Sequence, residues 1–256
     1  MIGAIIGDIV GSRFEKKNLK SKDFELFTKQ SRFTDDTVLT IAIADCILNS
    51  KGYEKTVKKY GRTYPFAGYG GAFKKWLAGI TSGPYNSWGN GSAMRVSPVG
   101  FAFDEVEKVL EEARKSAVIT HNHEEGIKGA QAIALSVFLA KNGSKKQEIK
   151  EFIEVKFGYD LNRTIDEIRL VYEFDVSCQG SVPESIIAFL ESDSFEDAIR
   201  TAISIGGDSD TIASMTGAIS EAYYKSVPQE FIEKMNEYLP KEFRKIIEEF
   251  KNKYST

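Results

Sequence analysis

Two short acidic motifs contain the residues of this sequence that are best suited to do chemistry. TDDT at residues 34–37 precedes the apolar run VLTIAIADCIL, and GGDSDT at 206–211 precedes IASMTGAISEAYY. Helix capping would explain one side chain in each motif, because Asp, Ser and Thr are preferred N-caps and acids suit the positive end of the helix dipole. Each motif, however, supplies two carboxylates. Four converging acids repel one another unless cations lie among them, so the motifs also fit a site for two hard divalent ions.

The scarcity of nitrogen and sulfur ligands restricts which metal such a site could hold. The 256 residues include only two histidines, His121 and His123, and two cysteines, Cys46 and Cys178. Two cysteines cannot build a disulfide framework or a four-cysteine zinc site. Ligands would therefore be mainly oxygen atoms, which favours Mg²⁺ or Mn²⁺. The two histidines open a helix, where a hydrogen-bonding role or simple capping is expected rather than metal binding.

A third acid, Asp8, interrupts the apolar start of the chain in the stretch GDIVGSRFE. A lone buried carboxylate is costly, so Asp8 should have a partner. We interpret it first as a structural hydrogen-bonding or ion-pairing group. Nothing in the composition singles out Glu15, seven residues further on.

Two glycine-containing segments could approach a ligand closely. GYGG at 68–71 precedes the helical stretch AFKKWL, and it fits either an anion site at a helix N-terminus or a plain turn. No GKS or GKT follows, so it is not a Walker loop. SWGNGSAMR at 87–95 could hold a phosphate and a ribose while Trp88 packs on a ring. Its alternative is a long turn with Trp88 anchored in the core.

The elements that must position these residues are predicted to be helices. Apolar residues recur at helical spacing, and strand signals are poor. The small-residue segments, including 209–224, allow close helix packing. We therefore predict an all-α fold and a single domain spanning 1–256. The periodicity predicts helices over 36–49, 53–60, 104–119, 125–141, 145–157, 184–192, 195–205, 209–224, 228–238 and 241–252.

Charge and hydropathy exclude other classes of protein. There are 37 acidic and 34 basic residues, for a net charge of −3, which argues against a generic nucleic-acid binder. No apolar run approaches the roughly 20 residues that span a bilayer, and the N-terminus lacks a basic region ahead of its apolar stretch. We expect a cytoplasmic protein that does not interact with membranes.

Taken together and in this order, the motifs resemble the ADP-ribosylglycohydrolase family, which includes dinitrogenase-reductase-activating glycohydrolase and the ADP-ribosyl-serine hydrolases. The resemblance covers most of the chain. The matching stretches are GDIVGSRFE, FTDDTVLT, GYGGAFKKWL, SWGNGSAMRVSPVGF, THNHEEGIKGA and IGGDSDTIASMTGAISEAYY.

The resemblance implies a compact orthogonal helical bundle with two Mg²⁺ or Mn²⁺ ions at the base of a cleft. It implies metal ligands at Thr34, Asp35, Asp36, Asp208, Asp210 and Thr211, and catalytic carboxylates among Glu15, Asp35 and Asp36. It implies substrate-binding residues at Gly68, Tyr69, Gly70, Gly71, Ser87, Trp88, Gly89, Asn90, Gly91, His121 and Ser209.

The reaction that the resemblance implies is hydrolysis of the glycosidic bond at C1″ of the distal ribose, which releases ADP-ribose and reverses ADP-ribosylation. The acceptor stays open: arginine, serine, another side chain, a small molecule or a nucleobase, although nucleic acid itself is not expected. Direct attack by water and opening of the ribose ring are both open as mechanisms. Two other functions compete: a non-catalytic ADP-ribose-binding or structural relative, and a metal-dependent phosphohydrolase that cuts the diphosphate.

Overall fold

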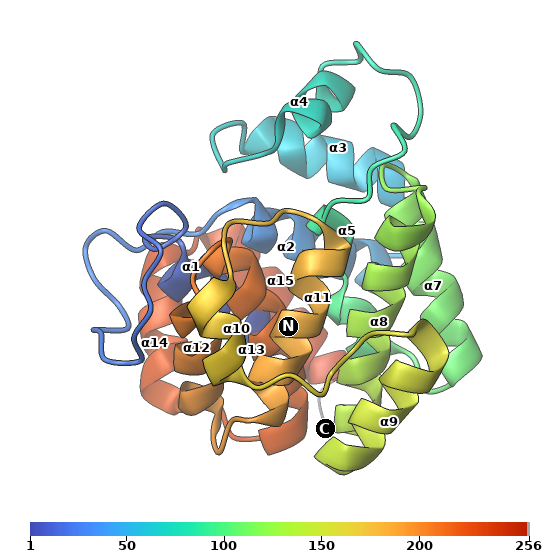
Figure 1. Cartoon of the computed structure of the whole chain (residues 1–256). Coiled ribbons are helices and arrows are strands. Elements are labelled where there is room, and N and C mark those ends of the chain that lie inside the picture. The colour runs from blue at the N-terminus through green and yellow to red at the C-terminus, as the bar shows by residue number, and fades with distance from the viewer. Residues whose placement is uncertain (255–256) are drawn as a thin grey trace.

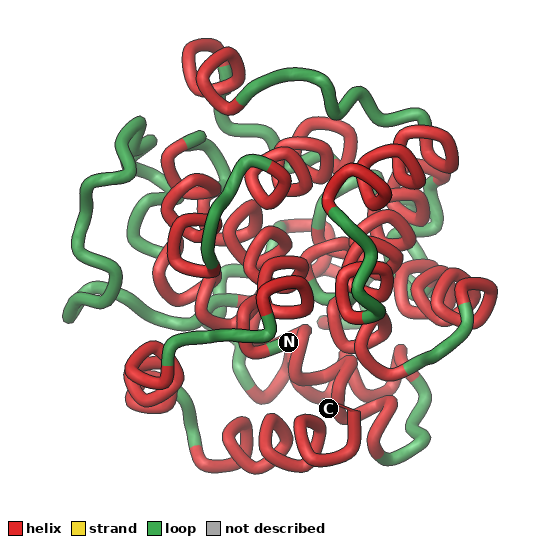
Figure 2. The backbone as a smooth tube through the Cα atoms, turned by 90° about the horizontal axis from the view of Figure 1, so that it is seen from below, coloured by secondary structure: helices red, strands yellow, loops and turns green. Residues whose placement is uncertain are grey.

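The computed structural model describes residues 1–254, and these residues form helices joined by loops (Figures 1 and 2). No strand occurs within them; the nearest approach is an isolated antiparallel bridge between Gly89 and Ser177. The prediction of an all-α fold is confirmed. The helices are α1 (Ile2–Gly11), α2 (Asp35–Leu48), α3 (Tyr53–Thr63), α4 (Gly71–Leu77), α5 (Gly91–Met94), α6 (Ser97–Ala102), α7 (Val106–Val118), α8 (Glu124–Lys141), α9 (Lys146–Phe157), α10 (Ile165–Val171), α11 (Cys178–Leu190), α12 (Phe195–Ser204), α13 (Ser209–Tyr224), α14 (Gln229–Tyr238) and α15 (Lys241–Tyr254).

The predicted helices match observed ones within a few residues, except at the start of α11. That helix begins at Cys178, six residues before the predicted position of 184, and includes Pro183. Its first turns contain glycine, serine and proline, which are poor helix formers. The Ser177 side chain nevertheless caps the helix by accepting a hydrogen bond from the main-chain N–H of Gly180. The helices α1, α5, α6 and α10 had no counterpart among the predicted segments.

Helix α1 lies in the centre of the molecule, and all ten of its residues are buried. One face carries Gly3, Gly7 and Gly11, spaced four residues apart, and this face packs antiparallel against α13. A Cβ atom on Gly3 would lie 2.1 Å from the carbonyl oxygen of Gly217, and one on Gly7 would lie 2.1 Å from that of Ala213. Only glycine permits backbones to come so close. The predicted close packing of segment 209–224 therefore depends on glycines of α1.

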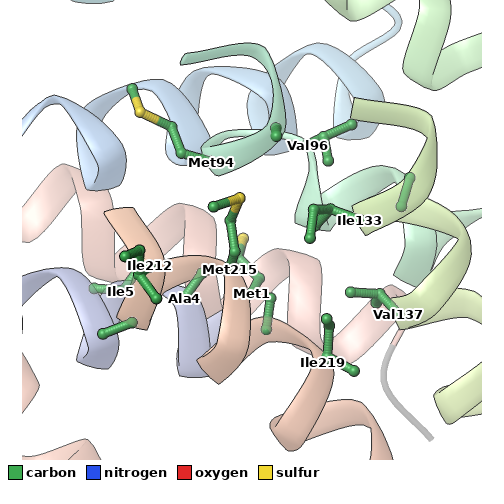
Figure 3. Packing of buried hydrophobic residues seen from close by; sticks show 14 of the residues in the cluster. Met1, Ala4, Ile5, Met94, Val96, Ile133, Val137, Ile212, Met215 and Ile219 are labelled. Carbon is green, nitrogen blue, oxygen red and sulfur yellow. The ribbon is translucent and has the colours of Figure 1, made fainter. Parts of the chain in front are cut away.

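Apolar side chains from several helices complete the core around this pair. Figure 3 shows Ile5 of α1, Met215 of α13 and Ile133 of α8 among the residues that converge there. Helices α3 and α4 form a projection at one end of the molecule (Figure 1). No helix in the described part of the chain combines the length and the apolar character needed to cross a bilayer.

Candidate active site

A cleft of about 470 Å³ opens where the starts of α2 and α13 meet the glycine loop before α4. It brings together most of the residues that the sequence singled out, although they lie up to about 200 positions apart. The predicted residues that line it are Glu15, Thr34, Asp35, Asp36, Gly68, Gly70, Gly71, Ser87, Gly89, Asn90, Gly91, His121, Asp208, Asp210 and Thr211.

The start of α2 is built around Asp8 of α1. Thr34 is the N-cap of α2, and its hydroxyl accepts a hydrogen bond from the main-chain N–H of Asp36. The same hydroxyl donates to Asp8 Oδ1 over 2.7 Å, and the Thr34 N–H donates to Oδ2 over 2.9 Å. Thr37 adds two further hydrogen bonds, from its N–H and its hydroxyl, to Oδ2. The interpretation of Asp8 as a structural hydrogen-bonding group is confirmed.

The start of α13 has a different arrangement. Asp208 is at the N-cap position but makes no side-chain capping bond. Its Oδ2 instead accepts a hydrogen bond of 2.7 Å from the side-chain amide of Asn90. A Cβ atom on Gly11 would lie 2.6 Å from the Cα atom of Asp210, so this glycine brings the backbone of α13 against the end of α1. In the second motif, Asp210 Oδ1 accepts a hydrogen bond of 3.1 Å from the N–H of Thr211 in the first turn, so capping leaves only Asp208 of this motif unexplained.

Carboxylates from the two helix starts converge on Asp8. Oxygen atoms of Asp8, Asp36 and Asp210, all buried, lie within 4.8 Å of one another. The Thr211 hydroxyl joins the two starts by donating to Asp36 Oδ2 over 3.2 Å. The other oxygen, Asp36 Oδ1, is buried and has no hydrogen-bond partner among the described residues. A buried carboxylate oxygen without a donor is costly. A hard cation among these oxygens would satisfy it, so the donor set fits a divalent metal.

The raised pKa values of the aspartates also indicate a site for a cation. Burial, and then the charges of neighbouring carboxylates, raise the pKa of Asp36 and of Asp210 well above the ordinary range. Burial, and then the charges of Asp8, Asp208 and Glu15, together raise the pKa of Asp35 to about 8. Without a cation, these groups therefore hold protons that an exposed aspartate would have lost. Perturbed carboxylates gathered in a cleft are typical of a functional site.

The glycine loop lies directly beside the acids. The main-chain N–H of Asp35 donates to the carbonyl oxygen of Ala67 over 2.8 Å, which ties the loop to α2. Gly68 has a φ of +113°, a conformation that other residues rarely adopt, and a Cβ there would lie 3.0 Å from Asp35 Oδ1. A Cβ on Gly70 or Gly71 would meet nothing within 4 Å, so these positions leave the loop backbone open to the cleft.

Three predicted substrate-binding residues do not line the cleft. The Tyr69 side chain is buried and its ring stacks on Phe73. Ser209 is buried, and its hydroxyl donates to the carbonyl oxygen of Gly207. Trp88 is 48% exposed and faces a separate shallow hollow that it shares with His123. Their roles toward a substrate stay predictions.

The cleft also includes residues that the sequence did not single out for binding. Arg95 ends the segment SWGNGSAMR, so its place at the cleft could have been inferred from that motif. Tyr85 lies two residues before the motif. Arg32, Phe66 and Phe174 lie in irregular segments, and no spacing pattern marks them; Phe66 is 98% exposed at the rim.

Comparison with known families agrees with this geometry. The model of the ADP-ribosylglycohydrolase family matches residues 1–256. The chain belongs to the ADP-ribosylglycohydrolase family. Membership confirms the resemblance described above and supports a hydrolase.

Individual relatives show how far the likeness extends. ADP-ribosylhydrolase ARH3 of Homo sapiens is 29% identical, over 88% of this chain and 84% of the relative. ADP-ribosylarginine hydrolase Tri1 of Pseudomonas putida is 22% identical, over 92% and 72% respectively. A solved structure described as an ADP-ribosylglycohydrolase-related protein complex superposes with a TM-score of 0.76 at 23% identity, covering 99% of this chain and 97% of that chain. The last match shows a shared fold.

Proposed function

We propose that this chain is a metal-dependent ADP-ribosyl-acceptor hydrolase. It would cleave the glycosidic bond at C1″ of an ADP-ribosylated protein or small molecule and release ADP-ribose. The observation that carries the proposal is the convergence of Asp36 and Asp210 with Asp8, where one oxygen of Asp36 is buried without a donor. Membership in the family and the names of the relatives support the choice of ADP-ribose as the substrate moiety.

Two Mg²⁺ or Mn²⁺ ions would be held by the residues of the two motifs. Carboxylate and hydroxyl oxygens suit both ions, and the cleft offers no cysteine ligand and only one histidine. The proposed ligands are Thr34, Asp35, Asp36, Asp208, Asp210 and Thr211. When bound, the ions would polarise ribose hydroxyls and lower the pKa of water.

The carboxylates at the cleft would supply the remaining chemistry. Asp35 and Glu15 are both partly exposed to the cleft, so either can reach a water molecule beside a bound ribose. Asp35 is ionised once positive charge offsets its neighbours, because an opposite charge lowers the pKa of a carboxyl group. An ionised Asp35 or Glu15 could take the proton of the attacking water. The nearby negative charges would also stabilise a transition state with oxocarbenium character.

The glycine-rich wall would accept the rest of ADP-ribose. Gly70, Gly71 and Gly91 expose backbone rather than side chains to the cleft, which leaves room for phosphate oxygens close to main-chain N–H groups. The bound nucleotide would thus be oriented before the reaction, and such positioning supplies much of the lowering of the barrier.

A hydrolysis assay over a panel of ADP-ribosylated acceptors, with Mg²⁺ and Mn²⁺ compared, tests the proposal. Arginine, serine and nucleobase acceptors should be included, since the cleft does not identify the leaving group. We expect free ADP-ribose as the product, and loss of more than about a hundredfold in rate for Asp210→Asn, beyond the range for outer partners of a metal. Asp104→Asn, on the exposed surface, is the matched control and should retain full activity.

Other products would contradict the proposal. AMP would indicate a phosphohydrolase that cuts the diphosphate. Tight ADP-ribose binding without turnover on any acceptor would indicate the non-catalytic alternative. Full activity of Asp210→Asn after treatment with a chelator would overturn the metal assignment.

A further inference from the structure

A row of three buried side chains reaches the cleft wall from inside the protein. Arg95 and Thr120 are completely buried, and His121 is 5% exposed. Arg95 Nη2 donates to Thr120 Oγ1 over 2.9 Å and to the carbonyl oxygen of Ser116 over 2.9 Å. Thr120 Oγ1 in turn lies 2.7 Å from Nδ1 of His121. The three side chains therefore form a continuous hydrogen-bonded row.

The direction of these hydrogen bonds follows from the number of protons. A guanidinium group only donates, so the Thr120 hydroxyl must accept from Arg95. If Nδ1 of His121 also donated to it, the hydroxyl proton of Thr120 would have to turn away from the imidazole toward the Tyr85 hydroxyl, the competing partner. Donation from Thr120 to Nδ1 over 2.7 Å satisfies both the hydroxyl proton and this nitrogen, although Nε and Nη1 of Arg95 have no partner among the described residues. The proton of a neutral His121 ring then belongs on Nε2.

The surroundings also keep the ring neutral. No carboxylate within residues 1–254 forms an ion pair with His121. Burial, and then the positive charge of Arg95, lower the pKa of His121 well below its ordinary value. A neutral imidazole has one donor nitrogen and one acceptor nitrogen, and here the row of side chains decides which is which.

The Nε2 edge of the ring faces two glycines of the cleft wall. A Cβ atom on Gly91 would lie 3.1 Å from Nε2, and one on Gly89 would lie 3.7 Å from it. Both glycines and His121 line the cleft. No hydrogen bond to Nε2 is formed by the described residues, and the absence of side chains at 89 and 91 leaves this nitrogen accessible to a ligand.

We propose that Arg95 and Thr120 are positioning residues that fix His121 as a neutral Nε2–H donor to an acceptor oxygen of the bound nucleotide. The nature of the nucleotide rests on the proposed function, whereas the position of the proton does not. Phosphate oxygens and the ring oxygen of a ribose only accept hydrogen bonds, so either suits this donor. A fixed donor loses little rotamer freedom when the ligand binds, which favours affinity.

The proton can be located directly, because the chain contains only two histidines. Long-range ¹H–¹⁵N spectra of the full chain, labelled with ¹⁵N-histidine and without nucleotide, should show Nε2 of His121 protonated and Nδ1 unprotonated at neutral pH. His123→Asn assigns the two rings and keeps a good N-cap for α8. A ring protonated on Nδ1, or charged at neutral pH, would overturn the proposal whether or not the protein hydrolyses any substrate.

Three variants test whether Thr120 sets this state. Thr120→Val has nearly the same shape and removes the hydroxyl; it should abolish the single tautomer and weaken ADP-ribose binding, measured calorimetrically with Mg²⁺, by about two- to tenfold. Thr120→Ser should restore both properties. Tyr85 is the competing partner, since its hydroxyl also interacts with Thr120, and Tyr85→Phe should leave the tautomer unchanged.

The outcomes separate a positioning role from a structural one. An unchanged tautomer and affinity in a folded Thr120→Val protein would refute the role of Thr120. A changed tautomer in Tyr85→Phe would show that Tyr85 helps to decide which nitrogen of His121 carries the proton, which would also contradict the proposal. The binding of adenosine and of ADP to Thr120→Val should be measured in the same way. A loss confined to the ligands with phosphate would place the acceptor oxygen on the diphosphate, and a loss shared by adenosine would place it on the proximal ribose.

Discussion

The starts of α2 and α13 carry similar acidic motifs but are held in different ways. At α2, Asp8 accepts four hydrogen bonds from the backbone and side chains of Thr34 and Thr37. At α13, Asp208 accepts one side-chain hydrogen bond, from Asn90, and the backbone is pressed directly against Gly11. The first start is fixed by polar side chains, and the second mainly by the contact of two backbones.

Helix α1 supports both arrangements at once. Its Asp8 faces the start of α2, while its glycine face packs against α13. The distance between Asp36 and Asp210 therefore depends on an element that contains neither motif. The acids of the site are thus placed by a third helix, which contributes the carboxylate of Asp8 and a face of three glycines.

The largest loss of stability should follow from adding a side chain at Gly7, where the backbones of α1 and α13 are in contact. A Cβ atom at position 7 would lie 2.1 Å from the carbonyl oxygen of Ala213, which is backbone and cannot rotate away. Gly7→Ala should therefore lower the free energy of unfolding by about 2 kcal/mol or more, because overpacking outweighs the gain in helix propensity. It should also weaken divalent-ion binding by moving α13 away from Asp8. Urea unfolding and calorimetry with Mn²⁺ measure the two effects.

Gly52→Ala is the matched control for this prediction. Gly52 is the N-cap of α3, has a φ of −69°, and a Cβ there would meet nothing within 4 Å. Its stability should change by less than about 1 kcal/mol, the usual size of a cap effect. Equal losses in the two variants would show that the α1–α13 contact does not depend on the missing side chain.

The acidic motifs could be recognised in the sequence and most of the helices could be predicted from its periodicity, whereas the convergence of the acids was implied by the resemblance to the family. The role of α1 could not, because a ten-residue apolar segment that is buried all round has no periodicity to reveal its partner. The spacing of Gly3, Gly7 and Gly11 was visible, but glycine is equally suited to approach a ligand or another helix. Only the packed structure distinguishes these uses.

The rim of the cleft was predicted less completely than its floor. Tyr69 and Trp88 lie within recognisable motifs, yet their side chains point into the core and toward a separate hollow. In an irregular loop no period relates neighbouring side chains to one face, so a motif identifies the segment and not the direction of each residue. Phe66 and Phe174, which line the cleft, had no motif at all.

In the absence of divalent ions, Asp35 at the start of α2 should make the stability of the protein depend on pH. The pKa of Asp35 is about 8 in the folded protein, above the value of about 3.9 in an unfolded chain. The folded state thus binds this proton more tightly, so its stabilising contribution is complete below about pH 4 and is lost as the pH rises toward 8. Asp35→Asn lacks this loss, so its stability relative to the wild type should increase across this range, by at most about 1.4 kcal/mol for each unit of pH.

Thermal unfolding of both proteins in the presence of a chelator, from pH 4 to pH 8, measures this difference. Saturating Mn²⁺ should reverse it, since cations favour the ionised carboxylate and stabilise the wild type more as the pH rises. Parallel stability curves under chelating conditions would mean that burial does not hold a proton on Asp35.

Removing one hydrogen bond at each helix start should have the smallest effects, and it tests directly whether the two starts are held differently. Thr37→Val removes one of the four hydrogen bonds to Asp8, whereas Asn90→Ala removes the single side-chain bond to Asp208. We expect Thr37→Val to lower stability by about 1 kcal/mol and Mn²⁺ affinity by less than about threefold, because three donors remain. Asn90→Ala should lower Mn²⁺ affinity by about tenfold, as loss of a partner that orients a metal-binding carboxylate usually does.

Calorimetric titration of Mn²⁺ into the two variants and their double variant completes this comparison. The two hydrogen bonds share no partner, so their effects on binding free energy should add. If Thr37→Val instead weakens Mn²⁺ binding as much as Asn90→Ala, Asp8 takes part in binding the ions rather than only holding the start of α2. Asp8 lies close enough to Asp36 and Asp210 to share an ion with them. We expect it not to, because its carboxylate already accepts four hydrogen bonds.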